Sequence, residues 1–303
     1  MAISTFGLND RKPSQKGRWV TVDLHIHSIY SDGGFTPAQI LKYATAHFLD
    51  AVAIADHSEI KGALEGKTLA EKELKAPLVL TAQEVSAGNR FHFLLVNCNT
   101  PQSDFNKENI LARLTEHRRQ GGITILAHPW TMPNTKWARS CLRDLIADDL
   151  VDGIELFNSA ALEISDVREL WQRIWEEWID PYHLAVLGGS DFHHLHKGRY
   201  IGTGRSYLKV YSPGEQGIID ALRARRCVAG LFGIKNENEF GLLWGEEPWS
   251  TELQSLRDNL QKKLSCLNRF SPDYLRLFLT LFEAGHYQCL TDLLETSIYS
   301  DRR

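Results

Sequence analysis

The stretch TVDLHIHSIYSDGG, residues 21–34, places two histidines two positions apart at the end of an apolar run. Side chains alternate between the two faces of a β-strand, so His25 and His27 are predicted to share one face with Asp23. Two neighbouring imidazoles pack poorly in an apolar core but are good metal ligands. The stretch therefore predicts a metal site at a strand end, provided that the rest of the chain supplies further ligands.

The composition limits the class of protein. The chain has 303 residues, of which 43% are hydrophobic and 24% charged, and its net charge is −4. This is typical of a globular protein and predicts no general attraction to nucleic acid or membranes. No apolar run approaches the ~20 residues of a membrane span, and residues 1–18 lack the apolar segment of a signal peptide. Five cysteines without a CxxC pair predict neither a disulfide framework nor a zinc ribbon, so a cytoplasmic location is expected.

Strands and helices alternate along most of the chain, and this alternation predicts the fold class. The series starts with a strand at 18–27, a helix at 36–48 and a short buried strand at 50–56. Thr36 and Pro37 are typical of an N-cap and a first helical position. About seven or eight strands separated mostly by helices predict an α/β fold with a parallel sheet or barrel.

Three segments are expected. Residues 1–17 are polar and predict a flexible leader. Residues 18–234 contain the alternating strands and helices of the barrel. The composition changes at residue 235, and 251–294 predicts two or three helices, so 235–303 is expected to form a small helical C-terminal appendage.

Histidines and carboxylates recur where the predicted strands end. Asp32 follows the first strand, and the later strands carry Asp56 and His57, Gln83 and Glu84, His92, His128, and Asp191 and His193. The active sites of α/β barrels lie at the C-terminal ends of their strands. A single strand-end histidine is an ordinary polar residue, but six of them at the same end predict a metal site.

The residue types define the chemistry of this site. Imidazole and carboxylate together form a mixed ligand set that suits Zn²⁺, Mn²⁺ or Fe²⁺. Nine ligands exceed what one ion uses, so a cluster of two or three ions is expected, with Glu84 as the carboxylate that bridges two of them. Such a cluster lowers the pKa of bound water and binds the oxygens of a phosphoryl group.

The ordered motifs DLHIHS with SDG, ADH, QE, FHF, AHP and GSDFH, over residues 19–230, resemble the PHP (polymerase and histidinol phosphatase) family. The similarity is strongest to its stand-alone predicted metal-dependent phosphoesterases. The resemblance implies a distorted (β/α)7 barrel that hydrolyses phosphate esters at a trinuclear site of Mn, Fe or Zn. It also implies three ligand sets: His25, His27, Glu84 and Asp191 for one ion; Glu84, His92 and His128 for a second; and Asp32, His57 and His193 for the third.

Other residues near these motifs have two readings each. Asp23 and Asp56 precede ligands, so they either accept hydrogen bonds from imidazole N–H groups or have a structural role at the strand end. Asn158 lies at another strand end and either lines the pocket or does not. Trp130 either stacks on a base or sugar or packs in the core.

A phosphate group needs cationic partners besides metal ions. The segment 192–205 contains Lys197, Arg199 and Arg205, and Arg199 is the first choice as a phosphate contact, the alternative being a solvated loop. His194 is the first choice as a general acid for the leaving group. The alternatives are His196, or no catalytic role in an exposed loop. The remaining histidines are expected at the surface: His47, His117, His183 and His286.

The sequence thus predicts a metal-dependent phosphoesterase that uses metal-activated water. Its expected substrate is a small phosphorylated metabolite, a nucleotide or the end of a short RNA or DNA. One alternative is a metal-dependent amidohydrolase, although such enzymes often use a carbamylated lysine where this chain has Glu84. The other is a non-catalytic PHP binding module, which the complete ligand set disfavours. The substrate, native metal, oligomeric state and protein partners are not readable from the sequence.

Overall fold

The computed structural model describes residues 17–73, 76–88, 91–196, 199–232, 242–265 and 272–300. Nearly all of the predicted leader lies outside these ranges. The described strands are β1 (Arg18–Ile26), β2 (Ala51–Ile54), β3 (Leu78–Ser86), β4 (His92–Val96), β5 (Ile123–Leu126), β6 (Gly153–Asn158), β7 (Ala185–Gly189), β8 (Gly204–Val210), β9 (Cys227–Leu231) and β10 (Leu242–Trp244). The α-helices are α1 (Pro37–Ala46), α2 (Lys61–Ala70), α3 (Ile110–Arg119), α4 (Lys136–Ala147), α5 (Val167–Ile174), α6 (Gly214–Arg223), α7 (Trp249–Ser265), α8 (Pro272–Glu283) and α9 (Tyr287–Ser300).

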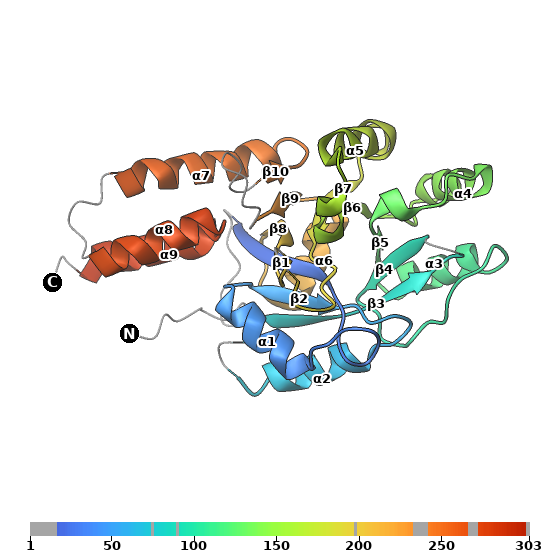
Figure 1. The fold of residues 1–303 in the computed structure, drawn as a ribbon, viewed down its shortest axis with the longest axis horizontal. Helices are drawn as coiled ribbons and strands as arrows, with labels where there is room; N and C mark the ends of the chain where they lie inside the picture. The colour runs from blue at the N-terminus through green and yellow to red at the C-terminus, as the bar shows by residue number, and fades with distance from the viewer. Residues whose placement is uncertain are drawn as a thin grey trace.

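The strands form one mixed sheet in the order β10-β9-β8-β1-β2-β3-β4-β5-β6-β7. Strand β7, at one end of this order, also packs against β1, β8 and β9, so the sheet curls into a nearly closed barrel with helices around it (Figure 1). The predicted α/β barrel with additional C-terminal helices is therefore confirmed. Figure 1 shows α7, α8 and α9 together on the side of the barrel opposite α3 and α4.

The sheet departs from a regular β/α repeat at two places. Strands β1-β2-β3 and β5-β6-β7 are parallel within each group, but β4 runs antiparallel to both β3 and β5. The connection from β3 to β4 is short, and only antiparallel neighbours can be joined without a long crossover. Strands β8, β9 and β10 are also antiparallel to their neighbours, and β9 and β10 were not among the predicted strands.

Helix α1 begins as its sequence predicts. Thr36 has extended backbone geometry, its side chain accepts a hydrogen bond from the backbone N–H of Gln39, and Pro37 occupies the first helical turn. The Gln39 side chain in turn accepts from the Thr36 backbone N–H, which completes a capping box. This cap fixes the point where the loop 28–36, which carries part of the predicted metal site, meets α1.

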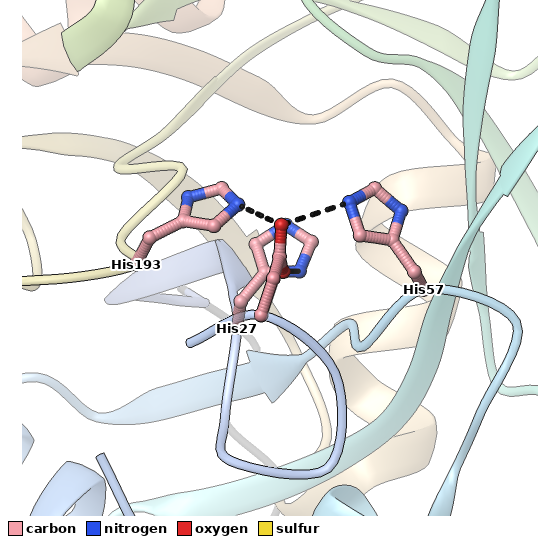
Figure 2. A group of neighbouring side chains, drawn as sticks. His27, His57 and His193 are labelled. Carbon is pink, nitrogen blue, oxygen red and sulfur yellow. Dashed lines mark ion pairs between the residues drawn. The ribbon is translucent and has the colours of Figure 1, made fainter. Parts of the chain in front are cut away.

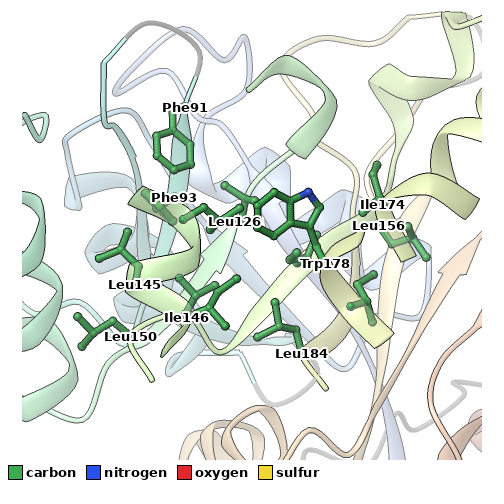
Figure 3. Packing of buried hydrophobic residues seen from close by; sticks show 14 of the residues in the cluster. Phe91, Phe93, Leu126, Leu145, Ile146, Leu150, Leu156, Ile174, Trp178 and Leu184 are labelled. Atoms are coloured by element: carbon green, nitrogen blue, oxygen red, sulfur yellow. The ribbon is translucent and has the colours of Figure 1, made fainter. Parts of the chain in front are cut away.

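The apolar core is divided among the barrel interior and its surroundings. Inside, alternate residues of the strands pack together with α6, for example Val20, Val22 and Leu24 of β1. Outside, β4, β5 and β6 bury a second cluster against α4 and α5, part of which Figure 3 shows around Trp178. Each fully buried aliphatic or aromatic side chain contributes about 1.5–3 kcal/mol to folding. The strand ends are therefore held by a rigid frame.

The C-terminal helices cover β1, β8 and β9. Trp19, Tyr207 and Phe232 of the barrel share one apolar cluster with residues of α7, α8 and α9. Within the described ranges, none of the helices combines the length and apolar character needed to span a membrane. Of the five cysteines, the four in the described ranges (Cys98, Cys141, Cys227 and Cys289) are free.

Candidate metal centre

The residues at the strand ends converge on one edge of the barrel. His25 lies in β1, Glu84 lies near the end of β3, and Asp191 follows β7. His92 is the first residue of β4, and because β4 is antiparallel its start lies at the same edge as the ends of the parallel strands. The structure brings together the nine residues predicted as metal ligands: His25, His27, Asp32, His57, Glu84, His92, His128, Asp191 and His193.

The first group of donors surrounds the two histidines of the opening motif. The Nε2 atoms of His25 and His27 lie 3.1 Å apart. Both face the same two carboxylates: Glu84 Oε2 lies 3.3 and 3.2 Å from them, and Asp191 Oδ1 lies 3.3 and 3.4 Å away. His25 and His27 are fully buried, and Glu84 is 1% exposed.

The second group uses the other oxygen of Glu84. Glu84 Oε1 lies 2.8 Å from Nδ1 of His92 and 2.9 Å from Nε2 of His128. One carboxylate therefore faces His25 and His27 with one oxygen and His92 and His128 with the other. This is the arrangement expected of a carboxylate that bridges two cations.

The third group is more open. Asp32 Oδ2 lies 3.2 Å from Nε2 of His193 and 3.6 Å from Nε2 of His57. Figure 2 shows His57 and His193 on opposite sides of His27, each joined by a dashed line to the carboxylate between them. The side chain of Asp32 is 54% exposed, so this is the part of the centre that water and small molecules reach.

The donor set fits divalent cations. The Nε2 atoms of His25 and His27 face each other at 3.1 Å, where both cannot carry a proton, and a cation between them and the two carboxylates would satisfy all four groups. Nδ1 of His92 is buried and has no hydrogen-bond partner among the described residues, although Glu84 lies beside it. Buried polar atoms normally form hydrogen bonds, and this nitrogen instead lies 2.8 Å from Glu84 Oε1 without hydrogen-bond geometry, so a cation beside both atoms would satisfy them.

The charges of the centre shift the pKa values of its groups. Burial alone lowers the pKa of His25, but Asp191, Glu155 and Glu84 outweigh burial and hold it well above its usual value. For His27, Asp191 and Glu84 outweigh burial in the same way and raise the pKa to about 9. Burial raises the pKa of Glu84, but the imidazoles of His25 and His128 outweigh it and hold the pKa well below its usual value.

A β-bulge changes the predicted alternation in β1. Asp23 pairs with Val52 and Ile26 with Ile54, so β1 has one extra residue between these pairs. The prediction that Asp23 shares a face with both histidines is therefore wrong. Its carboxylate accepts hydrogen bonds from the backbone N–H groups of His25, Ser190 and Gly202. Bulges at barrel rims commonly redirect a side chain toward an active site.

Asp56 also has a structural role. Its carboxylate accepts hydrogen bonds from the backbone N–H and the hydroxyl of Ser28 and from the hydroxyl of Ser31. These bonds fix the start of the loop that carries Asp32. Of the two readings of Asp23 and Asp56, the structural one holds for both.

Glu155 of β6 was missed in the sequence, although it touches the centre. Its Oε1 lies 3.1 Å from Nδ1 of His25, and its Oε2 accepts hydrogen bonds from the backbone N–H of His128 and from Asn158. It therefore orients two of the predicted ligands, as carboxylates behind metal-binding histidines do. Asn158, expected to line the pocket or not, supports Glu155 and caps the following 3₁₀ turn.

Two of the predicted ligands have unusual backbone conformations. His128 has a φ of 26° and Asp191 a φ of 51°. Positive φ is uncommon for residues other than glycine, and such conformations gather at functional sites. Gly189 also lies here, and a Cβ at this position would collide with Glu155 and approach Cβ of His25 to 2.7 Å. Gly189 thus lets β7 approach β1 and β6 closely.

The residues predicted to contact a phosphate or to act as the general acid lie in different surroundings. Arg199 NH2 lies 2.6 Å from Glu163 Oε1, and His194 is exposed, with its ring against the backbone of Gly34. Arg205 cannot contact a phosphate at the surface, because it is 1% exposed. Lys197 lies outside the described residues.

Two histidines predicted at the surface are buried. His117 is 5% exposed and its Nε2 lies 3.2 Å from the carbonyl of Ile123, so it packs between α3 and β5. His286 is 3% exposed and lies between α8 and α9. His183 is exposed, as predicted, and His47 is half-buried. The ring of Trp130 lies 6.2 Å from that of His128 and packs partly in the core.

Comparison with known proteins identifies a relative of the chain. No family model matches the chain. An uncharacterised protein of Methanocaldococcus jannaschii is 33% identical over 148 residues, which cover 45% of this chain and 81% of that protein. The chain thus belongs to the same family as this archaeal protein.

Solved structures show which fold this is. A two-domain protein of Bacteroides vulgatus that contains a predicted PHP-like metal-dependent phosphoesterase matches with a TM-score of 0.56 and 22% identity, over 72% of this chain and 66% of that one. A candidate metal-dependent phosphoesterase of Bifidobacterium adolescentis matches with a TM-score of 0.48 and 17% identity, over 71% and 98%. The chain spans about two thirds of the Bacteroides protein. The predicted resemblance to the PHP family is confirmed in the fold.

Proposed function

We propose that this protein hydrolyses phosphate esters at a cluster of three divalent metal ions, which Mn, Fe or Zn can supply. The observation that supports this most is that the donor groups share members. His25 belongs to two of the three possible metal-binding groups and so does His27, while both oxygens of Glu84 face imidazoles. Shared donors suit ions that lie close together, as in enzymes that act on phosphate esters.

The bound ions would supply Lewis acidity for the phosphoryl oxygens and a hydroxide-like nucleophile near neutral pH. The chain's own residues position the imidazoles and define the direction from which a substrate approaches. The carboxylates of the buried Glu84 and the partly buried Asp191 fix the imidazoles of His25 and His27 in one arrangement. The more exposed His57, Asp32 and His193 define the side from which a substrate reaches the centre.

Arg199 remains our proposed phosphate contact. Its guanidinium lies beside Glu163, whose side chain is 68% exposed. Exposed ion pairs are weak, so another anion can readily replace Glu163 as the partner of Arg199. A phosphate dianion is a stronger partner for guanidinium than an exposed carboxylate, because it offers more charge and bidentate geometry. Substrate would therefore displace Glu163 from Arg199.

His194 remains our proposed general acid. Its ring lies against Gly34, in the loop that also carries Asp32, and backbone N–H of Gly34 donates to the carbonyl of His193. His194 is thus attached to the open side of the centre, where a leaving group would depart. An imidazole in this place could donate a proton to the leaving alkoxide.

The proposed substrate is a small phosphorylated metabolite, a nucleotide or the 5′ end of a short oligonucleotide. The net charge of −4 gives no general attraction to a long polyanion. The amidohydrolase alternative receives less support, because the residue at the centre of the cluster is a glutamate and not a lysine. The non-catalytic alternative receives less support as well, because none of the nine donors is replaced by an apolar residue.

Release of inorganic phosphate by the purified protein tests this proposal. The substrates are phosphomonoesters, nucleoside 3′,5′-bisphosphates and 5′-phosphorylated oligonucleotides with Mn²⁺, and the His57→Ala protein is the blank. Turnover that disappears in the blank is expected. Absence of turnover on every member of the panel, with metal bound, would contradict phosphoesterase activity and favour the amidohydrolase or binding alternatives.

A further inference from the structure

Arg205 is a buried cation without a carboxylate partner. Its side chain is 1% exposed, and no carboxylate in the described ranges forms an ion pair with it. The guanidinium instead donates from Nε to the carbonyl of Gly202 at 2.6 Å and from NH1 to the carbonyl of Ala284 at 2.9 Å, and it lies over the ring of Phe232. Burying an unpaired charge is costly, so its position needs a reason beyond packing.

One partner of Arg205, the carbonyl of Ala284, lies at the C-terminal end of helix α8. Helix α8 closes with backbone N–H of Gly285 bound to the carbonyl of Phe282, and backbone N–H of His286 bound to that of Leu281. With Gly285 at a φ of 75°, this is a Schellman motif. It leaves the carbonyl of Ala284 free for Arg205, and the negative end of a helix favours a cation.

The other partner leads to the metal centre. Gly202, whose carbonyl accepts from Arg205, donates its backbone N–H to Oδ2 of Asp23 at 2.7 Å. Oδ1 of Asp23 accepts the backbone N–H groups of Ser190, at 2.9 Å, and His25, at 3.2 Å. Ser190 directly precedes Asp191, and its hydroxyl donates to the carbonyl of His25 at 3.2 Å. A continuous series of buried hydrogen bonds thus runs from the end of α8 to two predicted ligands.

We propose that Arg205 is a positioning residue of the metal centre. It fixes Gly202, and through Asp23 it fixes the backbone of β1 and β7 from which His25 and Asp191 extend. The turn 284–286 holds Arg205 in place, so the C-terminal helices are part of what shapes the metal centre. This inference rests on the proposed function only in requiring that the cluster binds metal.

Tyr207 provides a matched control. It lies two residues from Arg205 on the same strand, it is equally buried, and its hydroxyl donates to the carbonyl of Gly285 at 2.6 Å. Tyr207→Phe therefore removes one bond between the barrel and the same turn without touching Gly202. Any effect that comes only from loosening the C-terminal helices is shared by the two variants.

The test measures metal binding directly, with Co²⁺ as the probe. Binding constants come from calorimetry, and the visible absorption of Co²⁺ reports the geometry of its ligands. Both are recorded well below the melting temperature of each variant. Arg205→Gln is expected to change the Co²⁺ spectrum and weaken binding roughly tenfold. Tyr207→Phe is expected to lower the melting temperature and leave spectrum and affinity unchanged.

The outcomes separate this proposal from the proposed function. If the wild-type chain binds no Co²⁺, both proposals are contradicted. If it binds Co²⁺ and Arg205→Gln matches Tyr207→Phe in spectrum and affinity, only the positioning role is contradicted. Should Arg205→Gln fail to fold, Arg205→Lys replaces it, because a single ammonium cannot reproduce the fork between two carbonyls. An unchanged spectrum in that variant would equally contradict the positioning role.

Discussion

The candidate metal centre has a buried half and an open half, and the two differ in how their charges are balanced. In the buried half, the imidazoles of His25 and His27 are fully enclosed and depend on Glu84 and Asp191. In the open half, the side chains of Asp32 and His57 are 54% and 38% exposed, so water shares in balancing them. The comparison teaches that the buried half should hold its ions permanently, whereas the open half should exchange ions and admit substrate.

The largest expected effect is at Glu84. Glu84→Gln removes the carboxylate that lies within 3.5 Å of five imidazoles and leaves their protons uncompensated. Loss of measurable turnover and of most bound metal is expected, measured by phosphate release and by elemental analysis. Glu65→Gln is the control, since the carboxylate of Glu65 accepts a hydrogen bond from the hydroxyl of Tyr30 and belongs to none of the donor groups found among the described residues. Full metal content in Glu84→Gln would show that the buried half does not depend on this carboxylate to hold its ions.

Asp32→Asn should separate the halves. Asp32 is the carboxylate between His57 and His193, and it is not a close partner of His25. We expect turnover to fall by about 10²-fold while the buried half keeps its metal and the melting temperature changes little. Elemental analysis beside kinetics measures this. Equal loss of every bound ion would mean that the centre is a single cooperative unit.

Glu155→Gln should weaken the buried half selectively. Glu155 orients His25 and the backbone of His128 without belonging to any of the three donor groups. Metal affinity of the buried half is expected to fall by roughly 10- to 100-fold. Competition with a chelator of known affinity measures the loss. Unchanged affinity would show that packing alone fixes the His25 ring.

The pH dependence should also differ between the halves. Without metal, His27 has a pKa of about 9, so at neutral pH it carries a proton that a metal ion must displace. Affinity of the buried half should thus rise as the pH increases toward 9, by roughly tenfold per pH unit for each proton released. Burial lowers the pKa of His57, so the open half should show no such rise above neutral pH. Calorimetry in buffers of different ionisation enthalpy counts the protons; equal counts for both halves would contradict the comparison.

The sequence predicted the centre better than its surroundings, and the reason is physical. Histidines and carboxylates at strand ends are chemically conspicuous, and topology brings strand ends together whatever the loops do. Glu155 escaped notice because GIELFN reads as an ordinary buried strand, and its contact with His25 joins two strands that are 130 residues apart in the chain. Asp23 was misplaced because a bulge in β1 interrupts the alternation that the prediction assumed.

In the C-terminal region, the sequence did not indicate which residues are buried. His286 and Arg205 look like surface residues in the sequence, because nothing local indicates that α8 and α9 pack over β8. The N-cap Thr36 and the following Pro37 of α1 were readable, since the helix start depends on residues close together in the sequence. Local sequence signals therefore predicted the start of this helix correctly. Burial that depends on packing against distant segments could not be predicted from the sequence.

Anomalous X-ray diffraction from crystals of the Mn²⁺-loaded protein tests the central claim most directly. The account predicts anomalous peaks on both sides of Glu84, within reach of His25, His27 and His128, and a further peak between His57 and His193. That last peak should weaken first when the crystals are soaked in chelator. Absence of any anomalous peak in the cluster, with the imidazoles and carboxylates paired directly as ions, would contradict a metal centre and the hydrolytic chemistry proposed for it.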